Sequence, residues 1–257
     1  MEGGKGQAAG SDKERCLKMT DNRISIDARN LTKVYSRGNE EVLSVNDVSL
    51  QINKGDFVSI IGPSGSGKTT LINLLGCLDN PTSGELYLGG RPIFDTSKRL
   101  SERELTGIRR EVFGYIFQNF YLIPTLTVME NIMLPLTFYR KAGSENEVDK
   151  LLKLLGIDHR KNHLPGQISG GEMQRVAIAR AMVNMPEILM ADEPTGNLDT
   201  KRSAEIVQVL KDLSRHSGLT IIMITHNMKI AEQAERIFQM RDGRIDEINH
   251  QQDTNPD

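Results

Sequence analysis

The chain has 257 residues, of which 38% are hydrophobic and 26% are charged, and its formal net charge is −2. This composition is typical of a globular protein with a sizeable core, and so small a charge gives no electrostatic reason to expect nucleic-acid binding. The two cysteines, Cys16 and Cys77, set no disulfide framework and favour a reducing cytosol. No apolar run approaches the ~18 residues of a membrane span, so we expect any membrane connection to come through a partner.

Both ends of the chain are polar. Residues 1–22 and 247–257 lack periodic apolar positions, which predicts disordered or frayed tails. The sequence between them, residues 23–246, is expected to form one folded domain.

Three short apolar runs, at 56–62, 188–192 and 220–225, are rich in aliphatic residues and bounded by Gly, Pro or polar residues. Such runs are typical of strands buried on both faces, as in a parallel sheet covered by helices. Segments 43–56 and 84–94 alternate and contain turn residues, which predicts antiparallel strands. We therefore expect an α/β fold with a parallel-sheet core and an N-terminal antiparallel β subdomain.

The region at about 119–184 has a mainly helical pattern and predicts an inserted α-helical subdomain. Ser144 and Glu147 fit a capping box, and Gly156 fits the end of the helix. The apolar positions between them fall on one helical face: Val148, Leu151, Leu152 and Leu155.

The segment "IGPSGSGKTT" has the Walker A spacing, a glycine followed by four residues and then Gly67-Lys68-Thr69. It lies between an apolar strand and an expected helix, where backbone N–H groups can surround a phosphate. Lys68 is placed to reach the β- and γ-phosphates of ATP, and the Thr69 hydroxyl to ligate Mg²⁺. An unliganded Gly-rich turn is the alternative. The predicted ATP-binding residues here are Gly62, Pro63, Ser64, Gly65, Ser66, Gly67, Lys68, Thr69 and Thr70.

Two carboxylates, Asp192 and Glu193, end the second buried strand. A carboxylate at the C-terminal end of such a strand can lie beside the phosphate loop. Asp192 is then a candidate Mg²⁺ ligand through water, and Glu193 a candidate general base for the attacking water. A solvated strand end is the alternative for this common dipeptide.

Two further polar residues follow strands. His226 ends the third apolar run, which we expect to neighbour the Asp192 strand, so His226 could reach the γ-phosphate. Gln118 ends another apolar segment where the helical region begins, and its amide could ligate Mg²⁺ or position water. Each residue taken alone could equally be structural.

The segment "QISGGEMQR" places two glycines behind a serine, before an expected helix, and so offers a second anion-binding helix start. With the Walker A segment, Gln118, "ILMADEP", "GNLD" and His226, it follows the motif order of an ABC-type ATPase. The chain resembles the nucleotide-binding subunit of an ABC transporter over about 24–245. The segments "GCLDNPTSGE", "FQNFYLIPTLTVMENIMLPL" and "ADEPTGNLDT" are similar to its lipoprotein-release and macrolide-export group.

The resemblance implies further site residues. Tyr35 matches the aromatic residue that stacks on adenine, although an ordinary strand-end tyrosine is the alternative, and Asp199 matches the acid that links the two nucleotide sites. Ser169, Gly170 and Gly171 match the signature motif, which grips the γ-phosphate of ATP held by the other protomer. Two positions depart from the family pattern: Ile168 replaces Leu and Glu172 replaces Gln. We expect the Glu172 side chain to point away from the triphosphate.

The resemblance implies an ATP- and Mg²⁺-dependent ATPase that forms a head-to-tail homodimer around two ATP molecules. It would act at the inner face of the cell membrane through integral membrane permease subunits, with segment 119–137 as the expected contact, although run 120–123 could be core instead. Export and mechanical transmission without a transported substrate both remain open. A soluble ATPase acting on nucleic acid or ribosomes is disfavoured, because there is no coiled coil, second ATPase unit or basic patch.

Overall fold

A computed structural model describes residues 23–248 except 39, 96–98 and 140–144. The expected disorder of residues 1–22 and the proposed cap at Ser144 lie outside the described residues. In the described part no helix is long and apolar enough to cross a membrane.

The core is a six-stranded sheet with the strand order β10-β9-β3-β8-β7-β6. All neighbouring pairs are parallel except β9 with β10. The three strands expected to form a parallel sheet, β3, β7 and β8, are confirmed and lie side by side within it. The strands are β3 (Phe57–Ile61), β6 (Phe113–Ile116), β7 (Ile188–Asp192), β8 (Thr220–Ile224), β9 (Arg236–Arg241) and β10 (Arg244–Ile248).

Burial on both faces explains why these central strands are nearly continuous apolar runs. Along β7, Ile188 and Met190 pack into one hydrophobic cluster, whereas Leu189 and Ala191 pack into another on the opposite face. Since side chains alternate along a strand, every position in the middle of the sheet must be apolar. Ser59 is a polar exception in β3, with no exposed surface.

The first cluster lies between the central sheet and a four-stranded antiparallel sheet of order β2-β1-β4-β5, which confirms the predicted antiparallel strands. Helix α1 (Lys68–Leu75) contributes Leu71, Leu74 and Leu75 to this cluster. Packing on both sides therefore fixes the helix that follows the phosphate loop. The strands of this sheet are β1 (Ile24–Arg37), β2 (Glu40–Asn53), β4 (Ser83–Leu88) and β5 (Arg91–Phe94).

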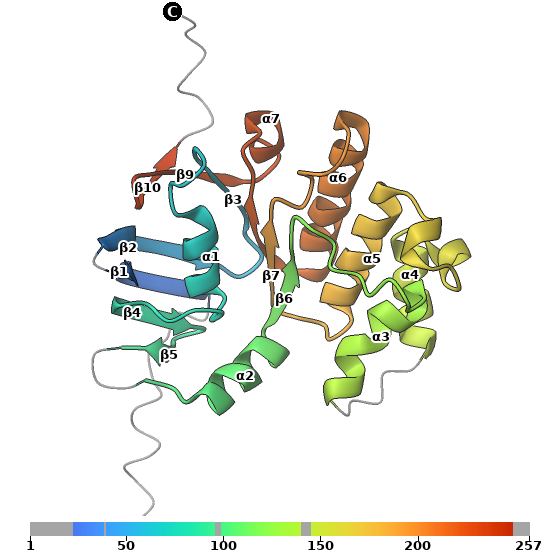
Figure 1. The fold of residues 1–257 in the computed structure, drawn as a ribbon, viewed down its shortest axis with the longest axis horizontal. Helices are drawn as coiled ribbons and strands as arrows, with labels where there is room; N and C mark the ends of the chain where they lie inside the picture. Colours follow the sequence, from blue (N-terminus) through green and yellow to red (C-terminus); the bar gives the residue numbers. More distant parts are fainter. Residues whose placement is uncertain (1–22, 39, 96–98, 140–144, 249–257) are drawn as a thin grey trace, which may run out of the picture.

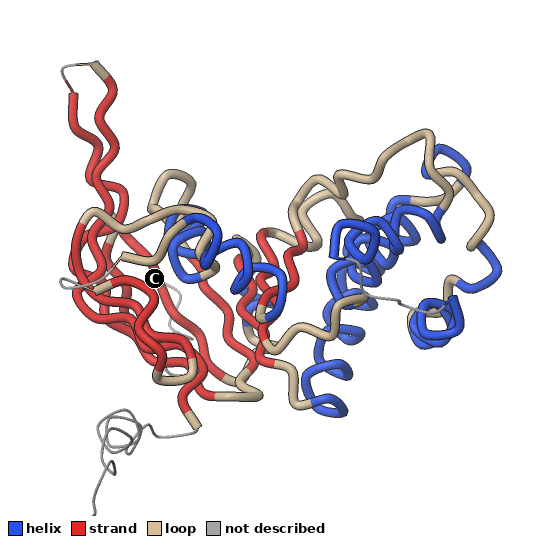
Figure 2. Tube along the Cα trace, turned by 90° about the horizontal axis from the view of Figure 1, so that it is seen from below, coloured by secondary structure: helices blue, strands red, loops and turns tan. Residues whose placement is uncertain are grey.

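The second cluster joins the sheet to the helices. Strands gather on one side of the molecule and most helices on the other (Figure 2). Residues 128–182 hold α3 (Val128–Tyr139), α4 (Glu145–Leu154) and α5 (Gly170–Met182), with short 3-10 turns at Asp158–Arg160 and Pro165–Gln167. The other helices are α2 (Glu102–Glu111), α6 (Thr200–Ser217) and α7 (Met228–Ala231).

Two expectations on helix and strand ends can be compared with the structure. The predicted helix around 148–155 is present as α4, with Val148 and Leu152 fully buried and Gly156 at a φ of 68°. At the C-terminus, β10 extends to Ile248, two residues into the segment expected to be a tail. Arg236 of β9 binds both carboxylate oxygens of Glu247 at 2.8 Å, which explains why this polar sequence is part of the sheet.

Candidate functional site

The predicted site residues follow four strands of the central sheet. Gly62 follows β3, Gln118 follows β6, Glu193 follows β7 and His226 follows β8. Because these strands are parallel neighbours, their carboxyl ends meet at one edge of the sheet. The fold therefore brings together residues that are up to 164 positions apart in the sequence.

The phosphate loop passes so close to neighbouring backbone that two of its glycines cannot be replaced. Gly67, the N-cap of α1, has a φ of 101°, and a Cβ atom there would lie 2.1 Å from the carbonyl oxygen of Ser44. A Cβ atom at Gly62 would lie 2.2 Å from the carbonyl oxygen of Met240. No side chain caps α1, and its first turn has no acidic residue. The first N–H groups of this helix are thus available to an anion.

The Lys68 ammonium lies inside this loop. It donates hydrogen bonds to the carbonyl oxygens of Gly62 at 2.9 Å and Pro63 at 2.7 Å, and its residue is 7% exposed. Burial lowers the pKa of Lys68 from its ordinary value, and the negative charges of Glu193 and Asp192 oppose this effect. A partly desolvated cation at the centre of the loop is suited to binding phosphate oxygens.

Asp192 and Thr69 provide oxygen atoms beside Lys68 that could ligate a metal ion. Burial raises the pKa of Asp192, whereas a hydrogen bond from the Thr69 hydroxyl favours the charged carboxylate and opposes that shift. A carboxylate and a hydroxyl oxygen are hard ligands that suit Mg²⁺, which takes its remaining ligands from water and phosphate. Among the described residues there is no cluster of three or more His, Cys, Asp or Glu able to hold a metal.

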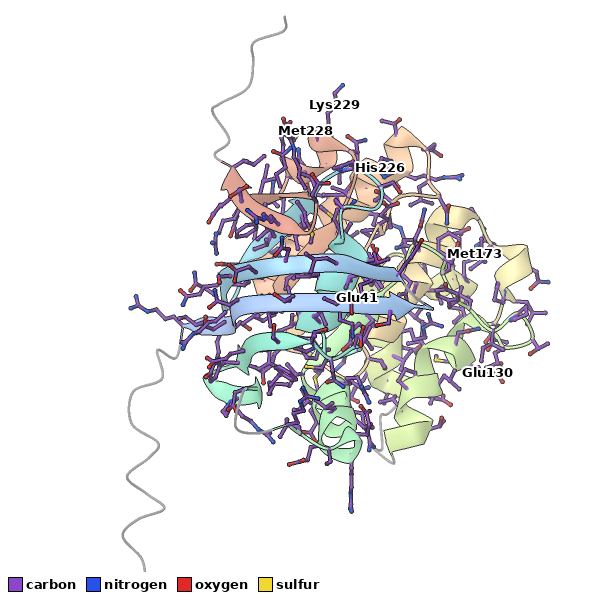
Figure 3. The ribbon with its side chains drawn as sticks, turned by 60° about the vertical axis from the view of Figure 1, so that its left-hand side comes forward. Glu41, Glu130, Met173, His226, Met228 and Lys229 are labelled. Carbon is purple, nitrogen blue, oxygen red and sulfur yellow. The ribbon has the colours of Figure 1, made fainter. Side chains whose placement is uncertain are left out.

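Glu193 and His226 are in contact at the edge of the sheet. Their carboxylate oxygen and ring Nδ1 are 3.4 Å apart, and the His226 side chain is 66% exposed. Glu193 has a φ of 48°, in the left-handed region that non-glycine residues rarely adopt and that is often found at functional sites. Figure 3 shows His226 beside the start of α7, where Met228 and Lys229 are also labelled.

The side chains of Gln118 and Glu193 both lie beside Gly196. A Cβ atom at Gly196 would lie 3.0 Å from the Gln118 side-chain nitrogen and 3.3 Å from a Glu193 carboxylate oxygen. The Gln118 carbonyl also accepts a hydrogen bond of 2.8 Å from the Asn197 side chain. The amide and the carboxylate thus approach the same small space.

A pocket of about 360 Å³ joins these groups. It contains six loop residues and Thr70 together with Glu193 and His226, so the loop and the candidate base face one space. The lining is Ser44, Gly62, Ser64, Gly65, Gly67, Lys68, Thr69, Thr70, Glu193 and His226. Ser44 was missed by the sequence analysis. Its hydroxyl lies 2.8 Å from that of Thr70, a contact between strand β2 and helix α1 that no local sequence pattern predicts.

Tyr35 is partly exposed, near the end of β1. Its hydroxyl donates to Asp79 at 2.7 Å, and the Lys33 ammonium lies 4.8 Å from its ring centroid and 2.8 Å from Asp79. One face of the ring is thus in a cation–π contact. Asp79 was not predicted, since its contact spans 44 residues.

The signature serine Ser169 is the N-cap of α5, as the sequence predicts for a helix start. Figure 1 shows α1 and α5 on opposite sides of β6 and β7. None of the described residues of the signature segment contributes to the lining of the phosphate pocket. The two helix starts predicted to bind an anion therefore lie at separate places in the chain's fold.

The expected direction of Glu172 relative to a triphosphate stays a prediction, but the structure shows contacts of this side chain within its own chain that the sequence analysis did not predict. Its carboxylate bends back and accepts hydrogen bonds from the Ser169 backbone N–H at 2.8 Å and hydroxyl at 2.7 Å, which forms a capping box. Arg160 donates to the other carboxylate oxygen at 2.8 Å. The helix N-terminus attracts the acid, and the sequence analysis missed Arg160.

Asp199 caps α6 and lies at an exposed turn. Its carboxylate accepts a hydrogen bond of 2.9 Å from the backbone N–H of Arg202 and is 57% exposed. The structure does not bring it into the phosphate pocket.

The run 120–123 is divided between surface and core. Tyr121 is 64% exposed and Ile123 37% exposed, whereas Leu122 packs against the second hydrophobic cluster. Arg180 of α5 donates to the carbonyl oxygens of Phe120 at 2.8 Å and Tyr121 at 2.6 Å. This loop after Gln118 is therefore tied to the signature helix and still presents apolar side chains to solvent.

Comparison with known proteins agrees with this arrangement. A family model described as ABC transporter matches residues 45–196. The chain is 47% identical to the ABC transporter ATP-binding protein MJ0796 of Methanocaldococcus jannaschii over 86% of this chain and 95% of that protein. It is 45% identical to the macrolide export ATP-binding/permease protein MacB of Chlorobaculum tepidum, over 89% of this chain and 34% of the relative.

Solved structures of MJ0796 have the same fold. The dimeric structure of that cassette superposes with a TM-score of 0.78 at 44% identity and covers 87% of this chain and 99% of the other. A second structure, described as a dimeric post-hydrolysis state bound to ADP and Pi, also gives a TM-score of 0.78, at 43% identity and with the same coverage of both chains.

The chain belongs to the ABC transporter family, and its fold is that of the ATP-binding cassette, an ATP-hydrolysing module. Within the family the expected likeness to the macrolide-export group is confirmed by the MacB relatives.

Proposed function

We propose that two copies of this ATPase associate head to tail around two ATP molecules. Each ATP would be held by the phosphate loop of one copy and by Ser169, Gly170 and Gly171 of the other. The observation that carries the proposal is the presence of two anion-binding helix starts, at Gly67 and Ser169, with only the first lining the phosphate pocket. The dimeric structures of MJ0796 support it.

Hydrolysis is assigned to the groups that meet at the sheet edge. Glu193 would take a proton from the attacking water, while His226, 3.4 Å from it, would contact the γ-phosphate. Lys68 would bind the β- and γ-phosphates, and the Tyr35 ring would stack on adenine. Thr69, Asp192 and Gln118 would hold Mg²⁺, which when bound neutralises phosphate charge.

Asp199 would connect the two nucleotide sites across the dimer, since it is exposed and lies in the segment between β7 and α6 that also contains Glu193. Its position at the N-terminus of α6 means that a movement of this helix would move that segment.

The ATPase cycle would drive membrane permease subunits. The exposed side chains of Tyr121 and Ile123, in the loop that Arg180 ties to α5, support this loop as the contact. The MacB relatives, whose name joins macrolide export with ATP-binding and permease parts, support a role in export. The molecule exported or extracted would be of the macrolide, lipoprotein or antimicrobial-peptide type, and the ATPase would act at the inner face of the cell membrane. Mechanical transmission without a transported substrate is the alternative, and it would use the same ATPase.

The test is Ser169→Arg. A bulky cation at the N-cap of α5 should block ATP-dependent dimerisation, measured by analytical ultracentrifugation, and leave ATP binding by the monomer within about twofold, because the phosphate loop is intact. Ser101→Arg is the matched control, since Ser101 also caps a helix within a capping box but lies outside both sites. Loss of monomer binding in Ser169→Arg with dimerisation retained would contradict the head-to-tail arrangement.

A further inference from the structure

The signature serine belongs to a three-residue contact with Glu172 and Arg160. One carboxylate oxygen of Glu172 accepts the Ser169 N–H and hydroxyl, and the other accepts the Arg160 Nε at 2.8 Å. His159 lies 3.7 Å from the oxygen that Arg160 binds. Both carboxylate oxygens of Glu172 are therefore occupied, and its side chain is only 21% exposed.

A second capping box in the same region shows that capping does not require the arginine. At the start of α3, Glu130 accepts the Thr127 N–H at 2.7 Å and the hydroxyl at 2.8 Å. Among the described residues, Thr127 is the only hydrogen-bond partner of the Glu130 carboxylate. Figure 3 shows Glu130 on α3 apart from Met173, the residue after Glu172 on α5. A glutamate can therefore complete a capping box in this subdomain without an arginine.

The difference is that α5 is the helix start at which a triphosphate would arrive. An uncompensated carboxylate directly after the signature glycines would repel the phosphate. Arg160 places a positive charge on the far side of that carboxylate. The pKa of Glu172 is held at about 2, first by the Ser169 N–H and also by Arg160, so the acid is ionised under all ordinary conditions and its charge must be balanced.

The hydroxyl of Ser169 adds a second requirement. Its single proton is donated to Glu172, so it must turn away from Glu172 to donate to a phosphate oxygen. After that turn the carboxylate still holds the Ser169 N–H and Arg160. The ion pair can therefore keep the helix start in place while the hydroxyl changes partner.

We propose that Arg160 is a positioning residue of the partner's ATP site, an inference that rests on the head-to-tail arrangement proposed above. It holds Glu172 against Ser169 and cancels the negative charge beside the incoming γ-phosphate. Glutamate at this position, where the family usually has glutamine, is then functional because the arginine accompanies it. Glu172 and Arg160 therefore act together at the start of α5.

The experiment measures ATP-dependent dimerisation by analytical ultracentrifugation in full-length protein carrying Glu193→Gln, which should trap dimers. Adding Arg160→Gln should raise the ATP concentration for half-maximal dimerisation roughly tenfold, because the Glu172 charge is exposed to the phosphate. Further addition of Glu172→Gln should return that concentration to within about threefold of the parent, since a glutamine can cap the helix without a charge. Lys161→Gln is the control, because Lys161 is adjacent but pairs with Asp149 at 3.3 Å; it should behave as the parent.

Two further readouts separate this role from simple bracing of the loop. The Arg160→Gln defect should shrink as NaCl is raised from about 50 to about 500 mM, because salt screens the repulsion, and ATP binding by the monomer should not change. If Arg160→Gln dimerises as the parent does, or if the double variant is as impaired as Arg160→Gln, the charge-balancing role is wrong. If the Glu193→Gln parent binds ATP and forms no dimer, the head-to-tail arrangement itself is overturned, and this inference with it.

Discussion

The starts of α1 and α5 are both rich in glycine and serine, but they are built in opposite ways. Helix α1 begins at Gly67 without a side-chain cap and without an acidic residue in its first turn, and a lysine follows directly. Helix α5 has Ser169 as its N-cap, and a capping box serves the N–H groups of Ser169 and Glu172, with an arginine bound to the acid. The start of α1 therefore has no side-chain cap and carries a positive charge. The start of α5 has a side-chain cap, and its acid is paired with an arginine.

This difference shows how one chain can carry two phosphate-binding segments that do not compete for the same ATP. The α1 start has positively charged and N–H groups directed into a pocket and would hold ATP without help. At the α5 start, the Ser169 hydroxyl must give up its hydrogen bond to Glu172 before it can donate one to a ligand. The net free energy of binding gained there is therefore smaller than at the α1 start. Such a half-site suits an ATP molecule that another copy already holds.

The largest effect on ATP turnover should come from a substitution that traps the ATP-bound dimer, in which the α1 start of one copy and the α5 start of the other hold the same ATP. Glu193→Gln removes the proposed base and leaves Lys68, Ser169 and their loops unchanged. ATP turnover should fall roughly 10²- to 10⁴-fold, while ATP binding is kept and the dimer persists, as measured by phosphate release and ultracentrifugation. Glu187→Gln is the control and should behave as wild type, because Glu187 is exposed and directly precedes β7, whereas Glu193 directly follows it. Normal turnover by Glu193→Gln would remove Glu193 from its assigned role.

Glycine-to-alanine changes compare the rigidity of the two starts. Gly67→Ala places a methyl group 2.1 Å from the Ser44 carbonyl in a left-handed conformation, and it should cost about 2–3 kcal/mol of unfolding free energy and abolish ATP binding. Gly170→Ala meets only Leu198 at 3.5 Å, so its unfolding free energy should stay within about 0.5 kcal/mol of wild type. Urea unfolding and calorimetric ATP titration measure both. Equal destabilisation by the two changes would mean that the starts do not differ in backbone constraint.

The sequence predicted those parts of the site that depend on spacing along the chain. The strand–loop–helix order around Lys68 and the position of Asp192 at the end of a buried run determine where these groups lie once parallel pairing is assumed. The contact between Glu193 and His226 follows from the same assumption, because their strands are neighbours. These features needed no knowledge of side-chain packing.

Contacts between side chains distant in sequence were not predictable in this way. Arg160 reaches Glu172 from a 3-10 turn, and Asp79 reaches Tyr35 across the antiparallel sheet. The capping contact of Glu172 with Ser169 was not predicted either, although the helix N-terminus attracts an acid. The capping pattern S-x-x-E that predicts this contact is present in the sequence.

The smallest effect concerns the acid dependence of the α5 cap. The folded-state pKa of Glu172 is lowered from 4.5 to about 2, so its contribution to stability is present above the unfolded pKa and is lost as pH falls through the folded value. Between about pH 5 and about pH 3, wild type should lose about 1 kcal/mol more unfolding free energy than Glu172→Gln, a figure reduced by solvent screening. Glu130→Gln should show a smaller difference, because hydrogen bonds from Thr127 lower the pKa of Glu130 without an arginine. Urea unfolding across this range measures both variants, and an equal acid response would mean that Arg160 adds nothing to the α5 cap.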